Sequence, residues 1–187
     1  ATQNSQSWPS AQPPTKIAGP VLRVHPTAAF EDERSSLISA SLSTELYDGA
    51  RVPGTSYVLD PERATLNIGA LVRWLDFNDA FYGATVIHPS DTFSGILAVA
   101  DWVSRTRAAQ GRKPLTMRDV LESAVKTYEI MGGLALENGF TAAGLDHTIL
   151  VKIATTPVVA RLLGGTREEL VDALSQAWVD GHALATF

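Results

Sequence analysis

The chain has 187 residues, of which 45% are hydrophobic and 19% charged, and its formal net charge is -5 at pH 7. This length and balance predict one globular domain, or most of one, with a buried core. The negative charge, without a dense run of lysine and arginine, argues against a nucleic-acid partner. The chain has no cysteine, which excludes disulfides and cysteinyl zinc or iron–sulfur sites, and no apolar run of about eighteen residues that could span a membrane.

Residues 1–57 predict an irregular or flexible lead-in, because serine, glutamine and proline dominate their first part. Within it, residues 30–47 carry a weak helical pattern in Leu37, Ile38 and Leu42, and residues 51–54 form a turn signal. From residue 58 to 187 the pattern becomes strongly helical. We therefore expect a second part, residues 58–187, that forms part of an all-α domain.

Apolar residues at three- and four-residue steps predict five helices in this second part. They cover residues 60–79, 91–111, 116–138 and 147–163, and a last helix from 166 that is still running at the end of the chain. Asp60, Ser90, Thr116 and Thr166 are the expected caps at the starts of the first, second, third and fifth helices. Residues 81–87 read as a loop, and Gly132 with Gly133 suggests a close helix contact or a bend.

Two carboxylates and an imidazole lie close together in the sequence at Asp76, Asp79 and His88, between two apolar helical stretches. A polar group placed between buried helices costs free energy unless it is hydrogen-bonded, and such positions often carry out proton transfer. The two acids are three residues apart, so one helix end would present both on roughly one face. The alternatives are two exposed helix-end acids and a loop histidine that bonds a backbone carbonyl.

Two further candidates lie in the fourth predicted helix, one at its start and one within it. His147 lies at its start, where the helix dipole lowers the pKa of an imidazole and favours its neutral form. Lys152 interrupts an apolar run, so it either extends to water or contacts a substrate carboxylate. A capping or interhelical role is the alternative for His147. The histidines and acids lack the spacing of a metal site, so we expect no metal, and no G-x-S-x-G motif supports a nucleophilic serine.

Three segments in collinear order resemble the MmgE/PrpD family. They are residues 73–79 (RWLDFND), 88–91 (HPSD) and 95–102 (GILAVADW), supported by residues 51–57 (RVPGTSY) and 174–181 (LSQAWVDG). The resemblance implies a helical domain that a second, α/β lid domain completes in the family, and an intact homodimer. It also implies loss of water from 2-methylcitrate in propionate breakdown, the methylcitrate cycle, without a cofactor or an iron–sulfur cluster.

Asp76, His88 and His147 match active-site positions of the family, so the resemblance makes them the candidate catalytic residues. Asp79 and Lys152 are the candidate contacts for a small tricarboxylate substrate. His88 and His147 would share proton transfer, and Asp76 would orient an imidazole. Which histidine acts as the base stays open at this point.

The sequence departs from the family pattern in ways that bear on activity. Ala80 stands where the family usually has threonine, and the basic segment that would bind substrate carboxylates is expected beyond residue 187. We therefore expect a lyase fragment without the lid domain and inactive alone. The alternatives are an enzyme that decarboxylates cis-aconitate and a non-catalytic helical association module. The expected compartment is the mitochondrial matrix in a eukaryote or the cytoplasm in a bacterium.

Overall fold

The computed structural model describes residues 49–185, so the helix expected at residues 30–47 lies outside the described part. Within that part the chain forms five α-helices: α2 (Pro61–Val72), α3 (Phe93–Ala109), α4 (Met117–Glu137), α5 (Thr148–Leu163) and α6 (Arg167–Val179). Three short 3-10 helices connect them: η1 (Trp74–Asp76), η2 (Pro89–Thr92) and η3 (Thr141–Ala143). The expectation of a helical fold is confirmed.

Two small antiparallel hairpins accompany the helices. Strand β1 (Ala50–Arg51) pairs with β2 (Val58–Leu59), and β3 (Phe81–Tyr82) pairs with β4 (Val86–Ile87). The first hairpin brings residues 49–57 into the packed part of the chain, with Ala50 and Val52 buried. The turn expected at residues 51–54 is confirmed, because the Thr55 N–H donates to the Val52 carbonyl across it at 3.2 Å.

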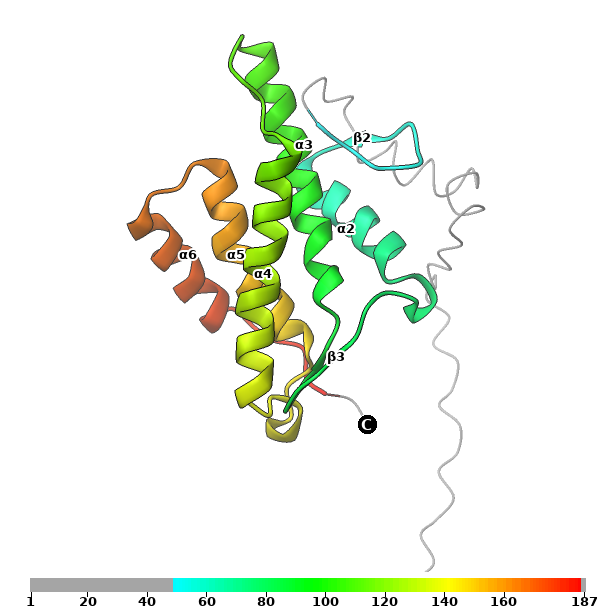
Figure 1. Cartoon of the computed structure of the whole chain (residues 1–187), viewed down its shortest axis with the longest axis vertical. Coiled ribbons are helices and arrows are strands. Elements are labelled where there is room, and N and C mark those ends of the chain that lie inside the picture. The colour runs from blue at the N-terminus through cyan, green and yellow to red at the C-terminus, as the bar shows by residue number, and fades with distance from the viewer. Residues whose placement is uncertain (1–48, 186–187) are drawn as a thin grey trace, which may run out of the picture.

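Helices α3 and α4 run through the middle of the molecule, with α2 and the first hairpin on one side and α5 and α6 on the other (Figure 1). Three apolar clusters hold this arrangement together. The first joins α2 and the first hairpin to α3, and the second joins α3, α4 and the end of α5. The third joins β4, α4, α5 and α6 around Ile87, Met131 and Leu150, which are fully buried. Burial of this apolar surface is the main force that holds the helices together.

Three of the four predicted helix caps are confirmed, whereas the Ser90 hydroxyl accepts from the Asn78 amide and caps neither η2 nor α3. The Asp60 carboxylate accepts the Arg63 N–H at 2.9 Å at the start of α2. Thr116 and Thr166 each form a capping box with the acid three residues on, at the starts of α4 and α6. These bonds satisfy backbone N–H groups that have no partner inside the helix. The α5 helix runs through Pro157 and ends at Gly164, which adopts φ 98°.

The first predicted helix is too long by seven residues. Helix α2 ends at Val72 rather than near residue 79, and Leu75 and Asp76, both within η1, adopt φ 56°. The apolar pattern continues past Val72, but Asn78 bonds the Asp91 carboxylate at 2.8 Å and pulls the chain away from the helix axis. Asp76 and Asp79 therefore do not share a helix face, and that prediction is wrong.

The prediction that the last helix runs to the end of the chain is also wrong. Helix α6 ends at Val179, because the next segment pairs instead with the chain before α5. The Asp146 N–H donates to the Ala183 carbonyl and the Ala185 N–H to the Gly144 carbonyl, both at 3.0 Å. This pairing holds the last described residues against the start of α5.

Three smaller expectations also differ from the structure. Residues 81–87 form the β3–β4 hairpin rather than a loop. The second predicted helix begins with η2, and α3 follows from Phe93. A Cβ added to Gly132 or Gly133 would meet nothing within 4 Å, so no close helix contact requires these glycines. Within residues 49–185, no helix has the length and apolar character needed to cross a membrane.

Candidate active site

His88 lies where strand β4 enters the η2 turn, and a hydrogen bond to a backbone carbonyl holds its ring. The following Pro89 favours extended backbone, and His88 has φ −122° and ψ 85°. Its Nδ1 lies 2.7 Å from the backbone carbonyl oxygen of Asp79. A carbonyl can only accept, so Nδ1 carries the proton when the ring is neutral. Nε2 is then the ring nitrogen that is left to exchange a proton with a ligand.

Asp79 is anchored by both oxygens of its own carboxylate. Oδ1 accepts the Ser90 N–H at 2.9 Å, and Oδ2 accepts the Tyr128 hydroxyl from α4 at 2.8 Å. Burial raises the pKa of Asp79, but the bonds from Ser90 and Tyr128 outweigh it, so the net pKa lies below the ordinary value. Burial, and then the Asp79 carboxylate, raise the pKa of Tyr128. Asp79 is therefore a charged anchor with both oxygens occupied by protein groups.

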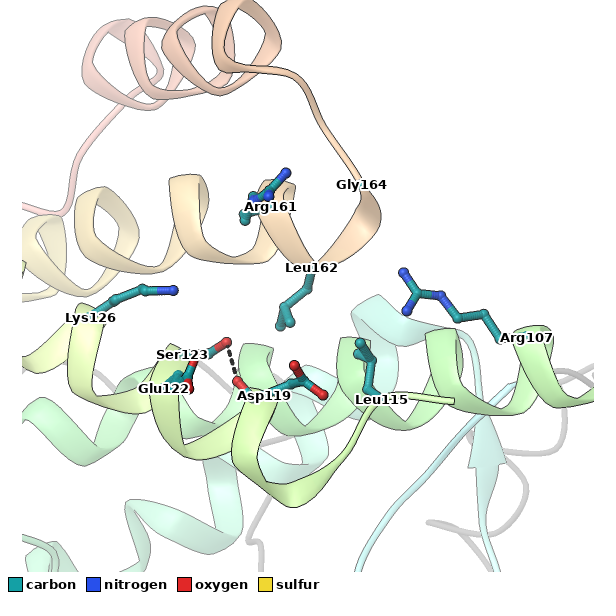
Figure 2. Close-up of a pocket in the computed structure, with 9 residues that line it drawn as sticks. All are labelled: Arg107, Leu115, Asp119, Glu122, Ser123, Lys126, Arg161, Leu162 and Gly164. Carbon is teal, nitrogen blue, oxygen red and sulfur yellow. Dashed lines mark hydrogen bonds between the residues drawn. The ribbon is translucent and has the colours of Figure 1, made fainter. Parts of the chain in front are cut away.

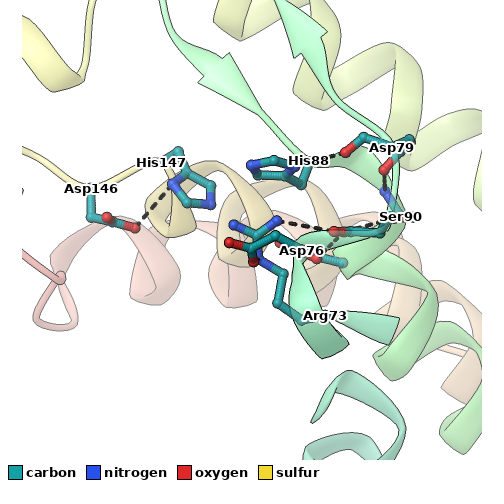
Figure 3. A network of polar contacts seen from close by, with 9 residues as sticks. Arg73, Asp76, Asp79, His88, Ser90, Asp146 and His147 are labelled. Carbon is teal, nitrogen blue, oxygen red and sulfur yellow. Dashed lines mark hydrogen bonds and ion pairs between the residues drawn. The ribbon is translucent and has the colours of Figure 1, made fainter. Parts of the chain in front are cut away.

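His147, at the start of α5, faces His88. The two ring centroids are 5.3 Å apart with an interplanar angle of 66° (Figure 3). The Nδ1 of His147 lies 3.4 Å from the Asp146 carboxylate, and its buried Nε2 has no hydrogen-bond partner among the described residues. Burial lowers the pKa of His147, and the nearby His88 and Arg73 lower it further, whereas Asp146 opposes them. The pKa of His147 is thus lowered in the expected direction, but burial is the main cause, whereas the sequence pointed to the helix dipole.

Arg73 supplies a positive charge to the same space. It follows the last residue of α2, and its Nη1 donates to the Asn78 side chain at 3.0 Å while its Nε lies 3.3 Å from the Asp76 carboxylate. Figure 3 shows the guanidinium beside the two imidazoles. The sequence does not single out Arg73 as a site residue, although it begins the RWLDFND segment. A cation at this position is the local positive charge that an anionic ligand requires in a net negative chain.

Asn78 and Asp91 connect Arg73 to the η2 turn. The Asn78 amide donates to the Ser90 hydroxyl at 3.0 Å and to the Asp91 carboxylate at 2.8 Å. Burial raises the pKa of Asp91, although Arg73 and both histidines act in the opposite direction. These contacts link the end of α2 to the turn that carries His88, so Arg73 and His88 are positioned by one hydrogen-bond network.

Two of the predicted site residues make other contacts. The Asp76 side chain is 75% exposed and pairs with Arg73, so it adjoins the cluster through that cation. The Lys152 ammonium donates to the carbonyls of Asp180 and Gly181 at 2.6 and 3.0 Å, which ties α5 to the end of α6. The structure thus brings His88, His147 and Asp79 together, with Asp76 at the edge and Lys152 engaged elsewhere.

A separate pocket of about 350 Å³ lies between the ends of α3 and α5 and the first half of α4 (Figure 2). Arg107, Lys126 and Arg161 surround it, together with two acids that already have partners. Asp119 caps α4, and Glu122 forms an ion pair within that helix. None of the predicted site residues lines this pocket, so we place the candidate site at the histidine cluster. Residues 49–185 contain no group of three or more histidines and acids that could hold a metal ion.

Comparison with known proteins agrees with the resemblance in the sequence. The profile of the MmgE/PrpD N-terminal domain matches residues 26–187. A 2-methylcitrate dehydratase from Cupriavidus necator is 58% identical over 140 residues, which cover 75% of this chain and 29% of that protein. The 2-methylcitrate dehydratase of Escherichia coli (strain K12) is 56% identical over 144 residues, 77% of this chain and 30% of that protein.

A mitochondrial 2-methylcitrate dehydratase from Yarrowia lipolytica is 53% identical over 141 residues, 75% of this chain and 27% of that protein. The chain therefore spans about 30% of the length of the curated relatives that it matches. The match to the family profile extends over most of this chain, from residue 26 to residue 187. This chain belongs to the MmgE/PrpD family, through the N-terminal domain of that family.

Proposed function

We propose that this chain supplies part of the active site of a hydro-lyase that removes water from 2-methylcitrate to give 2-methyl-cis-aconitate. The observation that carries the proposal is the pair of imidazoles, His88 and His147, 5.3 Å apart beside the Arg73 guanidinium. The relatives at 53–58% identity are named for this activity, which supports the same substrate class here. The small tricarboxylate is the partner that this arrangement suits.

The reaction needs one group to accept a proton from carbon and another to donate a proton to the leaving hydroxyl. His147 suits the base, because burial lowers its pKa and its Nε2 has no protein partner among the described residues. His88 lies opposite; in its imidazolium form, with a proton on each ring nitrogen, it delivers the Nε2 proton to the leaving hydroxyl while Nδ1–H stays bonded to the Asp79 carbonyl. The C–H and C–O bonds break, a carbon–carbon double bond and water form, and the imidazoles regain their starting protonation by proton exchange.

The substrate carboxylates require cations, and Arg73 is the one that lies beside the two imidazoles in the structure. Asp76 holds its Nε and Asn78 its Nη1, so within residues 49–185 the Nη2 amino group is left for a carboxylate. We propose that Asp76 acts on the site through Arg73, which differs from its expected role of orienting an imidazole. Lys152 stays a candidate substrate contact only if its bonds to the end of α6 open.

Assembly and compartment are further proposals. Leu121 and Val125 on one face of α4 are 57% and 60% exposed, and an intact homodimer is one way to cover such apolar side chains. The relatives include bacterial proteins and one named as mitochondrial, which supports the cytoplasm or the mitochondrial matrix as the location. Sedimentation of the intact protein tests the dimer.

A chimera tests the reaction directly. The matching segment of the Escherichia coli relative is replaced by this chain, and conversion of 2-methylcitrate is followed by product analysis. We expect dehydration, and we expect His88→Ala and His147→Gln each to lower turnover by about 10²- to 10⁴-fold, because each removes a proton-transfer group. Arg161→Gln, in the separate pocket, is the matched surface control and is expected to leave turnover unchanged.

Near-normal turnover in the His88→Ala chimera would contradict the proposal. Release of carbon dioxide from cis-aconitate, without dehydration of 2-methylcitrate, would instead identify the decarboxylase alternative. A chimera that is folded, binds neither acid and converts neither would favour the non-catalytic module. The isolated chain gives an independent measurement, because citrate is expected to shift the NMR signals of both site histidines, and Arg73→Gln is expected to weaken that binding.

A further inference from the structure

We propose that Tyr128 and Asp79 form a positioning pair that holds the His88 ring in one tautomer and one direction. The contacts form a continuous chain. The Tyr128 hydroxyl donates to Asp79 Oδ2 at 2.8 Å, and the Asp79 backbone carbonyl lies 2.7 Å from His88 Nδ1. The catalytic role of this pair rests on the proposed dehydration, whereas the hydrogen bonds that define the pair do not depend on that reaction.

The pair acts through the backbone because the side chain and the carbonyl of Asp79 belong to one short segment. The Ser90 N–H holds one carboxylate oxygen from the η2 turn, and Tyr128 holds the other from α4. Two bonds from different elements define where the Asp79 peptide group lies. The carbonyl then points at His88, so the imidazole keeps its proton on Nδ1 and leaves Nε2 free.

This arrangement changes the role expected for Asp79. Both oxygens of Asp79 accept hydrogen bonds from protein groups on different elements, so the contacts that the structure shows for this carboxylate are structural. Tyr128 falls in the apolar three- and four-residue pattern of its helix, which does not reveal a role for its hydroxyl. Its ring keeps that packing role against Phe93, with ring centroids 6.1 Å apart, and its hydroxyl is left to hold Asp79. Removal of the hydroxyl alone therefore separates positioning from packing.

The test uses the whole chain with ¹⁵N-labelled histidine, whose NMR spectra distinguish a proton on Nδ1 from one on Nε2. We expect the neutral His88 to carry its proton on Nδ1. Tyr128→Phe should speed exchange of that proton with water by roughly ten-fold and raise the Nε2-protonated fraction, because one hydrogen bond to a charged carboxylate is lost. Asp79→Asn should act in the same direction. Tyr82→Phe, at an exposed tyrosine of β3, is the matched control and should change nothing.

Three results would overturn the proposal: a His88 that carries its neutral-state proton on Nε2, a His88 that neither variant changes, or equal changes at His88 and His147. The last result would indicate general loosening, because the Nδ1 of His147 faces Asp146 rather than the pair. The positioning pair and the proposed reaction can fail separately. A His88 tautomer that depends on Tyr128, in a protein whose chimera does not dehydrate 2-methylcitrate, would support the pair and reject the reaction.

Discussion

Gly83 is a position where one added methyl group would clash with backbone atoms of another element. It lies in the β3–β4 hairpin, and a Cβ there would be 2.6 Å from the Ala135 carbonyl oxygen and 2.9 Å from its carbon. The same oxygen accepts the Thr85 N–H at 3.1 Å, so a shift that relieves the clash also strains this bond. Because backbone atoms on both sides must move, we expect Gly83→Ala to lower the free energy of unfolding by about 1–3 kcal/mol.

Gly133→Ala is the matched control, because it makes the same substitution within α4, where an added Cβ meets nothing within 4 Å. Alanine is favoured over glycine in a helix interior, so this variant should raise the free energy of unfolding by up to about 1 kcal/mol. Urea unfolding of both variants, with the slope m compared to the parent, measures the two effects. Changes of the same sign, or no loss of stability in Gly83→Ala, would refute the packing argument for the hairpin.

Two further predictions concern the first hairpin and the strained turn. Burial raises the pKa of Asp101, but the bonds from Arg51, at 2.6–3.2 Å, outweigh it and leave the pKa lowered. A carboxyl whose folded pKa lies below its unfolded value stabilises the fold above about pH 4, and this contribution is lost as the pH falls through the folded pKa. Because Arg51 is largely exposed, Asp101→Asn should cost about 1 kcal/mol in urea unfolding at neutral pH. The cost should shrink as the pH falls below about 4, and a loss that is equal at both pH values would contradict this assignment. Leu75 has φ 56° and is 65% exposed, so Leu75→Asn should raise the free energy of unfolding by up to about 1 kcal/mol, and calorimetry that shows a lower melting temperature would contradict it.

Three helix starts were predictable because the signals for them are local. Asp60, Thr116 and Thr166 each cap a helix through a bond to the residue three positions on. The pairing of His88 with His147 was reached through the family resemblance, since fifty-nine positions separate them and no local pattern relates them. Local chemistry therefore predicts where elements begin, and it does not predict which of them meet.

The remaining features depend on contacts between distant parts of the chain. Tyr128 reads as one more residue of an apolar stripe, and only its approach to Asp79 gives its hydroxyl a role. From its apolar run in the sequence, Lys152 was expected to contact water or a substrate. In the structure its ammonium instead donates to the carbonyls of Asp180 and Gly181. These partners lie 28 to 49 positions away, so helical periodicity contains no information about them.

The early end of α2 avoids an unfavourable placement of negative charge that a longer helix would have. A helix continuing to Asp79 would place two carboxylates at its C-terminal end, where the helix dipole disfavours negative charge. Because α2 stops at Val72, the residue at that end is Arg73, whose positive charge the dipole favours. The two left-handed residues that follow cost backbone free energy, since L-residues are disfavoured there. The same two residues turn the chain, so that Asp79 reaches His88 and Tyr128. The site therefore forms only because the helix breaks at this point.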